Sequence, residues 1–421
     1  MTVRVQDVAS GRLPLGALPR VDGRLLGGAL ALLLGGAAAI AGGYGWHPAA
    51  LYLLGGALGV VLYHAAFGFA AGWRAFVAEG RGAGLRAQML MLAVATAIFL
   101  PVLDAGTLFG QPVAGAVAPF GVSVLIGAFL FGLGMQLGGG CASGTLYAVG
   151  GGSGRMVVTL VFFIAGSLIG SLHMPWWLTA PSLGAISLAR SLGVPGALAL
   201  QLGLFGAIAL ASALVERRRH GGLGADLASG LPPAARSRLL RRVLQGPWPL
   251  AWGAVLLALL NVATLALAGH PWTISFGYTL WGAKAATALG VDLSAWPFWT
   301  WSYPKQALAG SLFTQSTSVM NFGVLAGAFL AAALAGSFGP IRNLSWRGAL
   351  ATALGGLLMG YGARLAFGCN VGAYFSGIAS GSLHGWLWFA AALAGTYAGI
   401  KLRPAFGLSV AHDRPGARRA G

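Results

Sequence analysis

The sequence predicts an all-α polytopic membrane protein, and three observations indicate this class. Hydrophobic residues make up 57% of the 421 residues and only 8% are charged, which gives a mean hydropathy of +0.78. Apolar runs that approach the ~20 residues needed to cross a bilayer recur along the chain. The 70 glycines favour helices that pack backbone to backbone, since lipid provides no hydrophobic drive between helices. A soluble globular class is excluded because so apolar a chain would precipitate from water.

Ten apolar runs predict about ten full transmembrane crossings, together with re-entrant segments. The stretch 275–318 is interrupted by Asp292, Pro297 and Lys305. We expect it to begin and end on the outer side, either dipping into the bilayer or crossing it twice. The predicted spans are 24–43, 49–72, 87–103, 119–135, 157–174, 195–215, 248–268, 319–338, 347–366 and 384–402.

A polar segment divides the chain into two transmembrane halves. This segment is rich in arginine and contains Pro232 and Pro233, which is typical of a linker. We therefore expect a first half at 1–215, a basic cytoplasmic linker at 216–246, and a second half with a basic tail at 247–421.

The net charge of +18 comes mainly from arginines beside the apolar runs. This is the positive-inside distribution, which orients helices during insertion and explains the charge without nucleic-acid binding. Both termini and the segments 74–86 and 216–245 are therefore predicted to be cytoplasmic. The segments 103–121 and 173–188 contain no Lys or Arg and are predicted to lie outside. The basic residues include Arg12, Arg20, Arg24, Arg74, Arg81, Arg86, Arg217, Arg241, Arg414 and Arg419.

The only two cysteines of the chain, Cys141 and Cys369, occupy matching glycine-rich segments. The offset between them, 369 − 141, is 228 residues, and flanking residues repeat at the same offset. Each copy lies between two apolar runs, so the pattern indicates an internal repeat. The matching pairs are Gly132 and Gly360, Gly134 and Gly362, Leu137 and Leu365, Gly140 and Gly368, and Gly144 and Gly372.

The charges beside the two copies predict opposite orientations. The helix before Cys141 follows the arginine-free segment 103–121, so it is predicted to run inward. The helix before Cys369 follows 341–347, which contains two arginines, so it is predicted to run outward. The sequence therefore predicts an inverted-topology repeat, an arrangement that many transporters share.

The cysteine loops combine features that suit a small anion containing sulfur. Glycines at 138–140 and 150–152 favour breaks in the helix, as a re-entrant segment requires. Unpaired amides at the start of the following half-helix favour an anion, and a thiol adds a soft, polarisable contact. We expect Cys141 and Cys369 on opposite sides of one narrow pore. Their duplication favours this role over inert packing, the usual role of a single membrane cysteine.

Polar residues near the loops extend the candidate pathway. Arg364 is predicted to lie at membrane depth, where an arginine is costly and therefore a functional candidate. A snorkelling arginine at the interface is the alternative, and Lys284 allows the same two interpretations. The candidate residues are Cys141, Cys369, Gly140, Ser143, Gly144, Gly368, Asn370, Gly372, Gln136, Arg364 and Lys284.

Several classes of activity are excluded. The sequence contains no phosphate-binding loop and no carboxylate pair, and Asp and Glu total only eight. Neither cysteine falls in a CxxC or a Cys/His zinc spacing. We therefore expect a transporter without a cofactor or metal, and neither an enzyme nor an ATP-driven pump.

Three segments resemble a known family. They are 132–145, with the sequence GLGMQLGGGCASGT, then 368–372, with GCNVG, and 382–386, with SLHGW. They are similar to the YeeE/YedE family of sulfur-transport membrane proteins. The resemblance covers both halves and implies uptake of thiosulfate or a related compound across the bacterial inner membrane. It also implies two inverted halves with substrate-contacting cysteines at Cys141 and Cys369, and in some cases a small cytoplasmic sulfur-carrier protein as partner.

One position departs from the family pattern. Thiosulfate-importing members often carry a further cysteine in an early Phe-Cys-Phe segment, where this chain has Phe67, Gly68 and Phe69. Transport of a related selenium compound is therefore an alternative. The sequence also allows a membrane enzyme that relays sulfur or electrons between the thiols, or a structural membrane subunit without transport.

Overall fold

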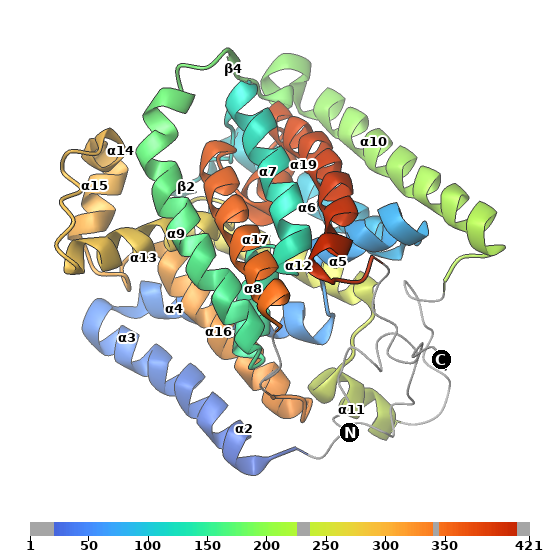
Figure 1. Cartoon of the computed structure of the whole chain (residues 1–421), viewed down its shortest axis with the longest axis horizontal. Helices are drawn as coiled ribbons and strands as arrows, with labels where there is room; N and C mark the ends of the chain where they lie inside the picture. The colour runs from blue at the N-terminus through green and yellow to red at the C-terminus, as the bar shows by residue number, and fades with distance from the viewer. Residues whose placement is uncertain (1–20, 225–235, 340–344, 411–421) are drawn as a thin grey trace.

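The structure is a computed structural model that describes residues 21–224, 236–339 and 345–410. This part of the chain is a bundle of helices (Figure 1). Its strands form only two short ribbons, and the predicted all-α polytopic membrane class is therefore confirmed. The ribbons pair β1 (Thr107–Leu108) with β2 (Gln111–Pro112) and β3 (Pro119–Gly121) with β4 (Ser182–Ala185).

Some segments used for the topology prediction lie outside the described residues. They are the arginines Arg12 and Arg20, the Pro232-Pro233 pair, most of the segment 341–347, and the tail arginines from Arg414 to Arg419.

The first half contains long helices interrupted at two places. The chain breaks after α4 and again after α7, and a short helix follows each break. The elements are α2 (Gly23–Leu30), η2 (Ala31–Gly35), α3 (Gly36–Tyr44), α4 (Trp46–His64), α5 (Phe69–Arg74), η3 (Ala75–Glu79), α6 (Ala83–Ala105), α7 (Val122–Gly138), α8 (Ala142–Gly150), α9 (Gly154–Trp177) and α10 (Leu188–His220).

The second half has the same two kinds of break, after α12 and after α17. It also carries an added segment, α14 and α15, between α13 and α16. The elements are α11 (Arg236–Gln245), α12 (Leu250–Ala268), α13 (Ser275–Ala288), α14 (Pro297–Thr300), α15 (Ser302–Ala309), α16 (Ser316–Leu334), α17 (Trp346–Leu365), η5 (Asn370–Ser376), α18 (Gly377–Ala379), α19 (Leu383–Leu402) and η6 (Arg403–Phe406).

Every predicted span overlaps a helix, although the span 49–72 contains the break between α4 and α5. Fewer helices are apolar enough to cross a membrane alone. Within the described ranges, eight helices meet that condition, or nine if the bent pair of α17 with η5 and α18 is one span. The prediction was about ten. α19 is not among them, because His384, Trp386 and several glycines lower its hydropathy, and α17 counts only together with η5 and α18. Half of the α19 residues are buried against other helices, so this helix needs fewer lipid-soluble side chains.

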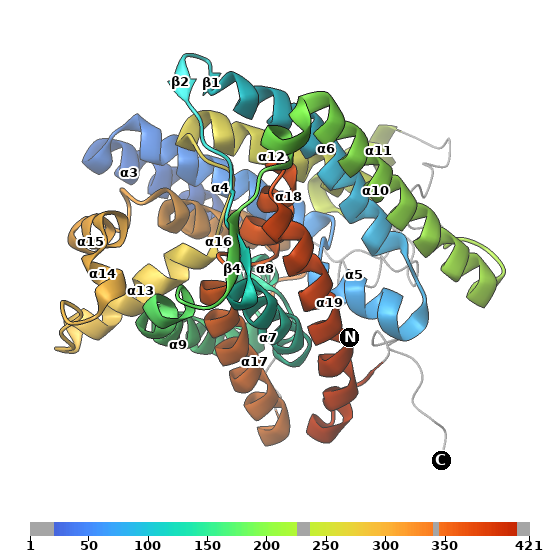
Figure 2. The same cartoon turned by 90° about the horizontal axis from the view of Figure 1, so that it is seen from above.

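The helices α7 and α17 cross at the centre of the bundle in opposite directions (Figures 1 and 2). A Cβ on Gly127 would lie 2.7 Å from the Gly362 carbonyl, and a Cβ on Gly134 would lie 2.7 Å from the Gly355 carbonyl. Residues near the start of each helix therefore face residues near the end of the other. Only glycine permits this backbone approach, which is how membrane helices gain packing without a hydrophobic drive.

The contacts around this crossing are reciprocal between the halves. The helix α7 packs on α19 as α17 packs on α9, and α4 packs on α16 as α6 packs on α12. The short α5 contacts α19, and α13 contacts α9 in the same way. Helices α2, α3 and α10 lie at the periphery, where α10 is joined to α6 by a buried ion pair between Arg86 and Glu216 at 2.7 Å.

Candidate functional site

The two cysteines begin half-helices with nearly the same backbone conformation. Cys141 precedes α8 with φ −86° and ψ −170°, and Cys369 precedes η5 with φ −100° and ψ −167°. The equivalent residues two positions earlier, Gly139 and Phe367, are both left-handed, with φ of +89° and +56°. The predicted breaks in the helices are therefore present, although one copy holds Phe in a conformation that favours glycine.

The contacts of the two thiols differ. The Cys141 sulfur accepts a hydrogen bond from the Gly144 amide at 3.4 Å and lies 3.3 Å from the Ser143 hydroxyl. Cys369 precedes a π-helical turn instead of a regular α-helical one. Helix α8 therefore begins with a regular cap, whereas η5 is wider, a form that is frequent at functional sites.

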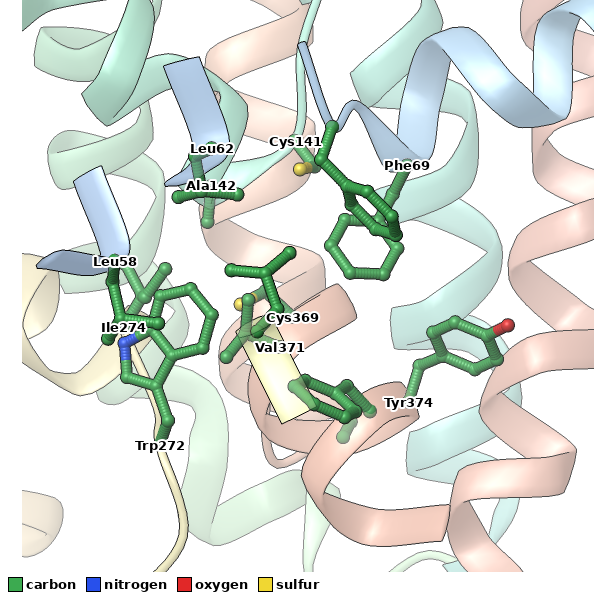
Figure 3. Packing of buried hydrophobic residues seen from close by; sticks show 14 of the residues in the cluster. Leu58, Leu62, Phe69, Cys141, Ala142, Trp272, Ile274, Cys369, Val371 and Tyr374 are labelled. Carbon is green, nitrogen blue, oxygen red and sulfur yellow. The ribbon is translucent and has the colours of Figure 1, made fainter. Parts of the chain in front are cut away.

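Both thiols are free and lie in one buried cluster at the centre of the molecule. Their exposed fractions are 1% for Cys141 and 0% for Cys369. Figure 3 shows Cys141 beside Phe69 and Cys369 beside Val371, with Ile274 in the same cluster. Because Phe69 follows the break after α4 and Ile274 the break after α12, all four interrupted helices meet here.

Tyr278 contacts the Cys141 loop. It is fully buried on α13, and its hydroxyl donates a hydrogen bond to the Ala142 carbonyl at 3.0 Å. The ring packs edge-on against Phe163, with 4.8 Å between centroids. Tyr278 therefore packs in the buried centre of the molecule against the Cys141 loop.

A cavity of about 310 Å³, which we call the arginine vestibule, ends at Cys141. It is surrounded by the ends of α4, α5, α16 and α19 and by the start of α9. Its lining residues are Tyr63, Gly68, Ala70, Ala71, Arg74, Gly139, Gly140, Cys141, Gly144, Tyr147, Ala148, Gly151, Ser153, Arg155, Met156, Ser337, Gly339 and Arg403.

A second cavity of about 700 Å³, the histidine vestibule, lies at the opposite ends of α4, α9 and α16. Helix α4 has 19 residues, about 28 Å at the usual rise of a helix, so the two cavities open toward opposite faces. The lining residues are His47, Pro48, Leu51, Met174, Leu178, Ala268, His270, Thr273, Phe276, Phe298, Trp301, Tyr303, Pro304, Thr314, Gln315, Ser316, Thr317, Arg364 and Phe367.

The histidine vestibule borders the Cys369 loop, since Phe367 lines it. Thr273 lines it, and a Cβ on Gly372 would lie 2.8 Å from the Thr273 hydroxyl. Arg364 lines the same cavity with its guanidinium over the Phe298 ring, 5.2 Å from the centroid. Its Nε is buried without a hydrogen-bond partner among the described residues.

The candidate residues from the sequence fall into three groups. Gly140, Cys141 and Gly144 line the arginine vestibule, and Arg364 lines the histidine vestibule. Ser143, Cys369 and Asn370 are fully buried around the centre, as are Gly368 and Gly372. Gln136 is buried and donates to the Ala70 carbonyl at 3.2 Å, while Lys284 is half-buried on α13. Neither Gln136 nor Lys284 lines a vestibule.

Sequence reasoning missed Arg74, Arg155, Arg403 and Tyr278. Each arginine stands at the end of an apolar run, where it is indistinguishable from a residue that only sets topology. Tyr278 lies in the interrupted stretch 275–318, which the sequence did not resolve into helices. The position of Gly68 in the arginine vestibule, near Cys141, follows from the break after α4 and was not predicted.

A family model described as Sulphur transport matches residues 64–398, and so includes both cysteine loops and the central helices. The chain belongs to the sulphur transport family. The resemblance noted in the sequence is therefore confirmed.

Curated relatives agree with this family. "Probable transporter YedE" of Salmonella typhimurium is 30% identical over 165 residues, 39% of this chain and 40% of that protein. The "Thiosulfate transporter TsuA" of Spirochaeta thermophila is 29% identical over 279 residues, covering 63% of this chain and 73% of the relative. The Escherichia coli protein of the same name is 25% identical over 349 residues, which cover 80% of this chain and 88% of that protein. The matches to YedE thus span about two fifths of those relatives.

Proposed function

We propose that this protein is a transporter or channel for uptake of a small sulfur-containing anion such as thiosulfate. The observation that carries the proposal is the pair of vestibules that open to opposite faces and approach the two thiols. Membership of the sulphur transport family and the names of the TsuA relatives support this class of substrate. The alternative cargo, a related selenium compound, has the same charge and a similarly soft atom.

The proposed orientation puts the arginine vestibule on the cytoplasmic side of a bacterial inner membrane. Support comes from Arg74, Arg155 and Arg403 at that end of the helices, in agreement with the positive-inside rule. Both termini then lie in the cytoplasm, and a small sulfur-carrier protein would meet the protein on this side.

The reciprocal packing and the opposite directions of α7 and α17 support an inverted repeat.

The proposed pathway runs from the histidine vestibule past Arg364 to Cys369, then past Tyr278 to Cys141 and the arginine vestibule. The thiols and the amides of Gly144 and Gly372 hold the anion briefly without forming a covalent bond. Binding of this kind is weak enough to let an ion leave. Gly140, Ser143, Gly368 and Asn370 shape the loops, while Gln136 and Lys284 stay candidates at the edge of this pathway.

Uptake into proteoliposomes tests the proposal. Purified protein is reconstituted and supplied with labelled thiosulfate, sulfite, selenite or sulfate. We expect thiosulfate or another reduced sulfur anion to enter faster than sulfate. If none of the four anions enters faster than into protein-free liposomes, transport of small sulfur or selenium anions is wrong.

A sulfur-relay enzyme is the second candidate, and one observation favours it. Arginines line the cavity at Cys141, and cations near a thiol favour the reactive thiolate. In such an enzyme a cysteine thiolate would attack the outer sulfur of thiosulfate, so that a persulfide forms on the cysteine, the S–S bond of thiosulfate breaks and sulfite leaves. The enzyme would lose all activity when either cysteine becomes serine, because an oxygen atom cannot carry that sulfur.

A further inference from the structure

The short helix α11 carries apolar side chains on the outside of the protein. Leu239, Val243 and Leu244 have exposed fractions of 39%, 41% and 47%, and residues four positions apart lie on one face of a helix. Arg242, by contrast, is buried, and its Nε donates to the Pro247 carbonyl at 3.1 Å. A helix that faced water would be arranged the other way round, with its apolar side chains toward the protein. The apolar face of α11, defined by Leu239, Val243 and Leu244, is therefore left for a partner.

The end of α11 is fastened beside a membrane-spanning helix. Four residues, 246–249, separate it from α12, and the indole N–H of Trp248 donates back to the carbonyls of Arg242 and Val243 at 3.1 and 3.0 Å. Helix α12 has 19 residues, about 28 Å at the usual rise, which just crosses the hydrocarbon core. Trp248 therefore lies at the border of the core, a position that tryptophan favours.

The short connection puts α11 at the level of the lipid headgroups. Figure 1 shows α11 beside the end of α16, another helix that is long and apolar enough to cross a membrane. Three side chains of a ten-residue helix on their own offer far less than the roughly 800 Å² that each partner buries in a stable protein interface. The bilayer is thus the nearest partner for the apolar face.

The segment that contains α11 is basic. Residues 217–245 include seven arginines and one acid, Asp226. This excess is a property of the sequence and holds whichever side chains pair with one another. Basic segments beside a membrane-spanning helix attract anionic lipids, and an apolar face on a helix rich in arginine is the pattern of a helix that lies in the membrane interface.

We propose that α11 lies along the cytoplasmic surface of the bilayer, with Leu239, Val243 and Leu244 among the acyl chains and the basic segment 217–245 beside anionic phospholipids. The partner of this surface is the lipid itself. The proposal goes beyond the transport function, and it holds whichever anion the protein carries.

Spin labels on α11 test its depth in full-length protein reconstituted into vesicles. Single cysteines, Val243→Cys or Leu244→Cys, are introduced after both native cysteines are replaced by serine. The matched control is Arg241→Cys, an exposed position on nearly the opposite side of the helix from Val243. We expect collisions with oxygen, which concentrates in lipid, to exceed those with a water-soluble nickel chelate about threefold or more at 243 and 244. The opposite order is expected at 241.

A photoreactive benzophenone amino acid in place of Val243 repeats the test with both native cysteines present. We expect it to cross-link to phospholipid, identified by mass spectrometry. Strong access of the chelate at 243 and 244 would put the face in water and overturn the proposal. Cross-links to a second copy of the chain, or within the chain, would overturn it in favour of a protein partner.

The same cross-link tests the choice of lipid. In vesicles of equal phosphatidylglycerol and phosphatidylcholine, we expect capture of the anionic lipid about twice as often or more. Replacing Arg236 and Arg238 together by glutamine should remove this preference. The matched control, Arg418→Gln with Arg419→Gln, takes two charges from the C-terminal tail and should preserve it. Equal capture of both lipids by the unmodified segment, or an equal loss in the control, would overturn recognition of anionic lipid by this segment.

Discussion

The loops at Cys141 and Cys369 share a backbone and differ in their surroundings. Both cysteines precede a half-helix with similar dihedral angles, and both follow a left-handed residue. At equivalent positions, however, Gln136 of one copy corresponds to Arg364 of the other, and Gly139 corresponds to Phe367. One loop borders a small cationic cavity and the other lies behind a larger, more aromatic one. The comparison indicates that a similar backbone positions both thiols, while different side chains make the surroundings of the two loops unequal.

The shared backbone depends on the glycines where α7 crosses α17, and this gives the largest expected effect. Gly355→Val places a side chain against the backbone of Gly134 and Gly138. Overpacking typically costs about 1–3 kcal/mol, and here backbone rather than a side chain must move. We expect a lower unfolding temperature in detergent, or no folded protein.

Gly203→Val on the peripheral helix α10 is the matched control, since a Cβ there meets no atom within 4 Å. Equal stability of the two variants would show that α7 and α17 can move apart without loss of stability. It would contradict close backbone packing as the basis of the arrangement that the two halves share.

The packing of Tyr278 against the Cys141 loop gives the second prediction, because this buried ring would close the path between the two vestibules. Tyr278→Ala removes a fully buried ring, so we expect a leak of small ions through reconstituted protein and thiol labelling from both faces. Tyr278→Phe retains the ring and loses only the hydrogen bond to Ala142, so it should stay sealed. Ion flux measured with a fluorescent indicator separates the variants. Tight vesicles and unchanged labelling with Tyr278→Ala would place the seal elsewhere.

Arg364 is the clearest side-chain difference between the copies. Arg364→Gln gives the second copy the residue of the first and removes a charge from the histidine vestibule. A hydrogen bond to a charged group contributes about 1.5–3 kcal/mol, so we expect the KM for thiosulfate uptake to rise roughly tenfold or more, with little change in maximal rate. Arg190→Gln on α10, outside both vestibules, serves as the control. An unchanged KM would assign Arg364 a packing role on Phe298.

The smallest effect is expected from conservative changes of the thiols themselves. A neutral thiol contributes a weak hydrogen bond of about 1 kcal/mol, and serine keeps a donor of similar size. Cys141→Ser and Cys369→Ser should each slow uptake about fivefold, and the corresponding alanine variants should slow it more. Complete loss in both serine variants, with normal membrane insertion, would reject non-covalent passage in favour of the sulfur-relay enzyme.

The class, most of the apolar helices and the helix breaks before the two cysteines were predictable because hydropathy and glycine spacing are local properties of the sequence. The position of Gly68 near Cys141 was not, since it depends on which interrupted helices converge. The cationic vestibule was also hidden, because Arg74, Arg155 and Arg403 lie 81 and 248 residues apart in sequence. The contact of Tyr278 with the Cys141 loop was hidden as well, since 136 residues separate it from Ala142.

The layer of buried side chains between the two vestibules also determines where in the protein a membrane potential falls. If water fills both cavities, most of a membrane potential falls across the layer around Cys141, Tyr278 and Cys369. Moving one charge through 100 mV corresponds to about 2.3 kcal/mol, and so about 4.6 kcal/mol for a divalent anion. An interior that is electrically negative opposes entry by that amount. Uptake therefore requires consumption of the anion inside, or the accompanying movement of cations, and its rate should fall steeply as the inside becomes more negative.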